Sequence, residues 1–122
     1  MKLTKVLIVD DSEVDQFLSR IAIEEFDATI EIIEAADGRE ALTMLKKMDA
    51  QPDVIFLDIN MPVMDGHEFL EEYSEVGYQS SVVVMSSSEQ EKDMACSTLY
   101  PCVKQYLSKP LDSESLAKIV RL

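Results

Sequence analysis

The chain has 122 residues and a formal net charge of −13 at pH 7, and 47% of its residues are hydrophobic. This length suits one domain, residues 1–122, with enough apolar side chains for a buried core. The acidic balance opposes binding to nucleic acid or to an anionic membrane surface, because both need clustered Lys and Arg. No apolar run is long enough for a signal peptide or a membrane span, so we expect a cytoplasmic protein.

Five short apolar runs alternate with amphipathic stretches along the chain. The runs are rich in β-branched residues and predict strands at residues 6–9, 30–35, 54–57, 82–85 and 103–107. Three runs are continuously apolar, which is typical of parallel strands buried on both faces. Polar residues interrupt the second and fifth runs, which places these strands at the sheet edges. The pattern favours an α/β fold, a flavodoxin-like doubly wound (βα)5 sandwich with a five-stranded parallel sheet in the order 2-1-3-4-5.

Capping residues predict where five helices begin between and after these strands. The expected caps are Ser12, Asp37, Asp65, Ser88 and Asp112. For the first helix, the expected buried stripe is Val14, Phe17, Leu18, Ile21 and Ala22. Gly77 predicts the end of the third helix.

Polar side chains follow four of the predicted strands. Asp10 and Asp11 follow the first, Asp58 follows the third, Ser86 the fourth and Lys109 the fifth. Because the carboxyl ends of parallel strands share one edge of the sheet, we expect these side chains to converge. Crowded carboxylates repel one another unless a cation lies between them, and Mg²⁺ suits oxygen ligands. A lysine and a hydroxyl could bind phosphate oxygens beside it, and a carboxylate nucleophile can form an acyl phosphate.

The order and spacing of these residues resemble those of response-regulator receiver domains over essentially the whole chain. The resemblance rests on Asp10-Asp11, the run Asp58-Ile59-Asn60-Met61-Pro62-Val63-Met64-Asp65-Gly66, Ser86, Tyr106 and Lys109-Pro110. It implies a signalling switch of a two-component phosphorelay, which takes a phosphoryl group from a histidine kinase or a histidine phosphotransfer protein. Asp58 would be the phosphoacceptor. Asp11, Asp58 and the backbone carbonyl of Asn60 would bind Mg²⁺ directly, and Asp10 would bind it through water.

The resemblance also implies how the switch works. Ser86 would be a hydroxyl that moves toward the phosphoryl group, and Tyr106 the aromatic partner that turns inward with it. Lys109 would bridge Asp58 and the phosphate. Many receivers carry an acidic pair shortly before the switch aromatic, where this chain has Lys104-Gln105. Symmetric dimers of such receivers use that acidic pair, so its absence puts a dimer through this region in doubt and leaves the oligomeric state open.

The sequence leaves other functions open. The main alternative is a degenerate receiver that binds proteins without being phosphorylated. A flavin carrier of the same topology is disfavoured, because the acidic loop Asp10–Glu13 repels phosphate. A phosphatase with an aspartate nucleophile is disfavoured, because its nucleophile would follow the first strand. We expect no enzymatic action beyond the domain's own phosphorylation and dephosphorylation, and an unidentified downstream protein as partner. Both a stand-alone regulator and a domain of a larger protein are compatible with the sequence.

Overall fold

A computed structural model of the chain describes residues 3–58, 66–78, 80–86, 102–108 and 111–120. The described elements follow in the order β1 (Lys5–Val9), α1 (Glu13–Phe26), β2 (Glu31–Ala35), α2 (Gly38–Lys47), β3 (Val54–Asp58), α3 (Gly66–Val76), β4 (Ser81–Ser86), β5 (Val103–Ser108) and α5 (Ser113–Ile119). The strands form one parallel sheet in the order β2-β1-β3-β4-β5, which confirms the predicted α/β fold. The helix expected to begin at Ser88 lies outside the described residues.

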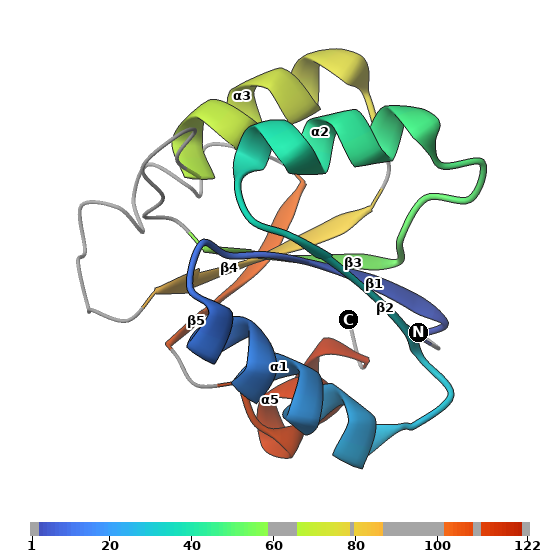
Figure 1. The fold of residues 1–122 in the computed structure, drawn as a ribbon, viewed down its shortest axis with the longest axis vertical. Coiled ribbons are helices and arrows are strands. Elements are labelled where there is room, and N and C mark those ends of the chain that lie inside the picture. Colours follow the sequence, from blue (N-terminus) through green and yellow to red (C-terminus); the bar gives the residue numbers. More distant parts are fainter. Residues whose placement is uncertain (1–2, 59–65, 79, 87–101, 109–110, 121–122) are drawn as a thin grey trace.

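The sheet is the middle layer of a three-layer sandwich (Figure 1). Helices α2 and α3 cover one face, and α1 and α5 cover the other. Each face has its own apolar cluster, one with Phe69, Leu70 and Tyr73 of α3 and the other with Ile23 of α1 and Leu116 of α5. Every residue of the central strand β3 is buried, whereas the edge strands expose polar side chains such as Glu31 and Lys104. The polarity of the strands therefore predicted their order correctly.

Short polar contacts fix the helix ends that the structure describes. Ser12, Asp37 and Asp112 each accept a hydrogen bond from the backbone N–H three residues further on, at 3.3, 2.8 and 2.8 Å. Gly77 follows α3 with a φ of +85°, a conformation that favours glycine, and its N–H donates to the carbonyl of Tyr73 at 3.3 Å. These four sequence predictions are confirmed. The cap expected at Asp65 lies outside the described residues. None of the helices in the described ranges has the length and apolar character needed to cross a bilayer.

The buried stripe predicted for α1 is largely wrong. Val14, Phe17 and Leu18 are 68%, 60% and 44% exposed. The helix instead packs on the sheet through Ala22 and Ile23, with the small residue Ser19 on the same face. Apolar residues recur at helical spacing on two sides of this helix, so periodicity alone did not identify the inward side. The exposed side carries the larger apolar side chains, and this is why it was predicted to be the buried one.

Candidate metal centre

The register of the central strands places two acidic residues next to each other. Val9, the last residue of β1, is paired with Leu57 of β3. The following residues, Asp10 and Asp58, therefore lie side by side where the two parallel strands end. Asp11 comes one residue later, before α1 begins. This arrangement follows from strand order and register, so the sequence could predict it.

The three carboxylates form a compact acidic cluster, defined by Asp10, Asp11 and Asp58. One oxygen of each lies within 4.8 Å of the others. Asp10 and Asp58 are 4% and 7% exposed, whereas Asp11 is exposed to solvent. Buried carboxylates that crowd together need positive charge or hydrogen bonds for stability. An all-oxygen set that is open on one side fits a hard divalent ion that keeps some of its water, such as Mg²⁺.

Hydrogen bonds hold the first of these carboxylates and its backbone. The Asp10 Oδ1 atom accepts from the N–H of Ser12 at 2.9 Å, and the N–H of Asp10 donates to the carbonyl of Ala35 at 3.1 Å. The side chain of Gln16, from the first turns of α1, donates from Nε2 to the carbonyl of Asp10 at 2.6 Å and to that of Ala35 at 2.9 Å. The contacts of Gln16 could not be predicted from the sequence, because a glutamine inside an amphipathic helix carries no signal for them.

The remaining predicted site residues are described only in part. Asn60 and Lys109 lie outside the described residues, as does the side chain of Ser86. The backbone of Ser86 ends β4, one residue beyond Met85, the register partner of Asp58. Tyr106 lies on β5 and packs against the cluster on the α2 and α3 side. Its hydroxyl oxygen is buried and has no hydrogen-bond partner among the described residues.

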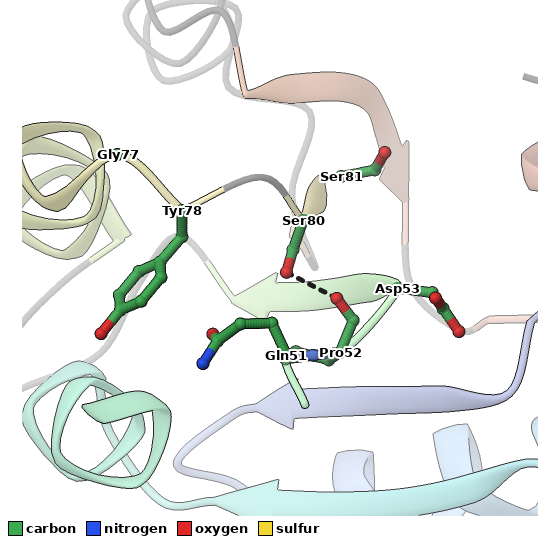
Figure 2. Close-up of a pocket in the computed structure, with 7 residues that line it drawn as sticks. All are labelled: Gln51, Pro52, Asp53, Gly77, Tyr78, Ser80 and Ser81. Atoms are coloured by element: carbon green, nitrogen blue, oxygen red, sulfur yellow. Dashed lines mark hydrogen bonds between the residues drawn. The ribbon is translucent and has the colours of Figure 1, made fainter. Parts of the chain in front are cut away.

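A concave surface lies at the opposite edge of the sheet (Figure 2). Its volume is about 530 Å³, and the loops that precede β3 and β4 line it. Ser80 is buried there and donates to the carbonyl of Pro52 at 2.5 Å. Asp53 directly precedes β3, whereas Asp58 is its last residue, so this hollow and the acidic cluster are at opposite ends of one strand. The cavity therefore does not belong to the predicted site.

At this edge of the sheet, residues at the start of β1 bind the side chain of Asp53. Its Oδ2 atom accepts from the N–H and the hydroxyl of Thr4 at 2.8 and 2.9 Å and from the N–H of Lys5 at 3.1 Å. Burial raises the pKa of Asp53, but these hydrogen bonds outweigh it and hold the pKa below the usual value. The carboxylate therefore joins the beginnings of two neighbouring strands as an ionised acceptor.

Comparison with known proteins agrees with the fold. The sequence model of the response regulator receiver domain matches residues 6–121. The chemotaxis protein CheY of Halobacterium salinarum is 34% identical over 113 residues, which are 92% of this chain and 89% of that protein. The crystal structure of a two-component response regulator from Cytophaga hutchinsonii superposes with a TM-score of 0.88 at 29% identity, covering 99% of this chain and 96% of that one.

One relative is much longer than this chain. The sensor histidine kinase CheAY of Helicobacter pylori is 32% identical over 117 residues, which are 95% of this chain but 14% of that protein. Receiver sequences of this kind thus occur both as nearly whole proteins and as parts of larger ones. The match of the family model over almost the full length, with the strand order and the acidic cluster, shows that the chain belongs to the response regulator receiver domain family of two-component signalling.

Proposed function

We propose that this receiver domain is a phosphorylation switch whose phosphoacceptor is Asp58 and whose phosphorylation requires Mg²⁺. The observation that carries the proposal is the convergence of Asp10, Asp11 and Asp58 within 4.8 Å at the carboxyl edge of the sheet, with two of the three buried. A degenerate receiver that only binds proteins has no need to maintain buried carboxylates this close together, because their mutual repulsion costs stability.

The proposed reaction is a phosphoryl transfer from a phosphorylated histidine. A carboxylate oxygen of Asp58 forms a bond to phosphorus while the P–N bond of the donor breaks, and the imidazole leaves with the electron pair. Mg²⁺, when bound, supplies positive charge for the phosphoryl oxygens. Asp11, Asp58 and the carbonyl of Asn60 would bind it directly, and Asp10 through water. The domain's part is to position these groups and to balance their charge.

The other proposed roles follow from the family's pattern. Lys109 would balance negative charge on the phosphoryl group, and Ser86 would donate a hydrogen bond to it. Tyr106 would pack further inward as Ser86 moves, so phosphorylation would shift the populations of two conformations. The buried Tyr106 hydroxyl, which has no partner within the described part of the chain, supports a side chain that can change its position.

The proposed partners are a histidine kinase or a histidine phosphotransfer protein as donor and a second, unidentified protein downstream. We place the domain in the cytoplasm, where ATP is available to such kinases. Catalysis on an external substrate is not part of the proposal. The net charge of −13 favours partners with basic contact surfaces over nucleic acid.

The test is intact-mass measurement after incubation with acetyl phosphate, with MgCl2 or with EDTA. The native chain should gain the mass of one phosphoryl group only with Mg²⁺, and Asp58→Asn should gain none. Asp53→Asn is the matched control, because it changes a carboxylate at the other end of the same strand, and it should be phosphorylated like the native chain. No gain in the folded native chain under either condition would contradict the proposal and favour a binding module without phosphorylation.

A further inference from the structure

We propose that Gln16 is a positioning residue that holds the backbone of Asp10 and thereby sets the affinity of the acidic cluster for Mg²⁺. The inference rests on the proposed function of that cluster. Its basis is the pair of hydrogen bonds from Gln16 Nε2, to the carbonyl of Asp10 at 2.6 Å and to the carbonyl of Ala35 at 2.9 Å. Gln16 does not itself belong to the metal-binding set.

The carboxamide of Gln16 fits its place in a specific way. Its nitrogen carries two hydrogens, and the two carbonyls use both. These carbonyls belong to the ends of neighbouring strands, because Asp10 directly follows β1 and Ala35 is the last residue of β2. One side chain therefore connects α1 to the ends of two strands. The N–H of Asp10 donates to the same Ala35 carbonyl at 3.1 Å, so this carbonyl accepts hydrogen bonds from both Asp10 and Gln16.

The position of Gln16 is itself fixed by the start of the helix. Its backbone N–H donates to the carbonyl of Ser12 at 3.0 Å, and Ser12 is the N-cap of α1. The N–H of Ser12 in turn donates to Asp10 Oδ1 at 2.9 Å. The side chain and the backbone of Asp10 are thus both held by the first turns of α1. Movement of α1 relative to the sheet would move this carboxylate.

Metal affinity depends on such indirect contacts. A ligand set must match the positions that the ion requires, and residues that orient the ligands commonly change affinity 10–100-fold when they are replaced. Without Gln16 Nε2, the carbonyl of Asp10 loses this donor, and the backbone before Asp11 gains freedom. We therefore expect Gln16→Met, which keeps the length of the side chain and removes its N–H groups, to weaken Mg²⁺ binding by about tenfold or more.

The chain contains a matched control in Gln51 (Figure 2). Its Nε2 also donates to two backbone carbonyls, those of Leu45 at 2.9 Å and of Met48 at 3.3 Å. Gln51 precedes β3 at the opposite edge of the sheet from the acidic cluster. Gln51→Met therefore removes the same type of double hydrogen bond far from the proposed metal. It separates a local effect on the site from a general loss of stability.

The experiment is a titration of each protein with MgCl2, followed by the backbone amide shifts in NMR spectra. Urea unfolding of the same samples measures stability. We expect only Gln16→Met to raise the Kd for Mg²⁺ about tenfold or more, whatever stability each variant loses. Should Gln16→Met be unfolded in buffer, the titration is repeated for all three proteins in trimethylamine N-oxide, which favours folded states.

The outcomes separate this inference from the proposed function. If the native chain does not bind Mg²⁺ saturably, the proposed metal site fails, and the role of Gln16 fails with it. If the native chain binds Mg²⁺ and is phosphorylated, but Gln16→Met has a Kd within twofold of the native value, only the positioning role is overturned. A similar loss of affinity in Gln51→Met would overturn it as well, because the effect would then not be specific to the acidic edge.

Discussion

Two substitutions in α1 should differ strongly in their effect on stability. Ile23 is completely buried, and replacing such a residue by alanine costs about 2–5 kcal/mol. Phe17 is 60% exposed, so only about two-fifths of its surface is withdrawn from water. Scaling the cost of about 3–5 kcal/mol for a buried phenylalanine by that fraction gives about 1–2 kcal/mol. Alanine favours the helix over both native residues by less than about 0.7 kcal/mol, which affects the two variants similarly.

Urea unfolding, followed by circular dichroism at about 222 nm, where helices absorb, measures the loss in free energy of unfolding for each variant. We expect Ile23→Ala to lower the free energy of unfolding by about 2 kcal/mol more than Phe17→Ala does. The slope of the free energy against urea should be unchanged, since neither variant alters how much surface unfolding exposes. If Phe17→Ala costs as much as Ile23→Ala, the outward orientation of the Val14, Phe17 and Leu18 side is wrong.

Three further predictions concern charged and capping groups. Asp53, whose pKa is lowered because hydrogen bonds from Thr4 and Lys5 outweigh burial, stabilises the fold when it is ionised. The native chain should thus be more stable than Asp53→Asn, with the full difference above about pH 4. The difference should be lost as the pH falls through the pKa that Asp53 has in the folded protein. An equal difference in urea unfolding at low and neutral pH would contradict this. Asp37→Ala should cost about 0.5–2 kcal/mol in urea unfolding, because the cap accepts from Glu40 at 2.8 Å, and no measurable loss would contradict the cap. Mg²⁺ at about 100 times its Kd for the native chain should add about 2.7 kcal/mol to the free energy of unfolding of that chain. The same concentration should add clearly less to that of Asp10→Asn. Equal gains would exclude a role for Asp10 in binding Mg²⁺.

The sequence predicted the fold well, because the decisive signals are local. Continuous apolar runs identified β1, β3 and β4 as central strands, and polar interruptions identified β2 and β5 as edges. Once the order is known, the register brings Asp10 and Asp58 together without further information. The caps at Ser12, Asp37 and Asp112 are likewise local, since each involves a side chain and an amide three residues away.

The errors and omissions arise where tertiary packing decides. In α1, two apolar sides compete, and the sheet accepts the one with the small residues Ser19 and Ala22 beside Ile23. The role of Gln16 depends on two carbonyls, one of them 19 residues further along the chain, which come together only in the folded protein. The hollow near Gln51 depends in the same way on two loops that are distant in sequence.

The most direct test of the central claim is to locate the phosphoryl group within the chain. The native protein is phosphorylated with acetyl phosphate and Mg²⁺ and then treated with borohydride, which reduces an aspartyl phosphate to homoserine, and the peptides are analysed by mass spectrometry. We expect homoserine at position 58 and at no other aspartate, including Asp10 and Asp11. Homoserine at another position, or none in a protein that has gained phosphoryl mass, would contradict Asp58 as the phosphoacceptor.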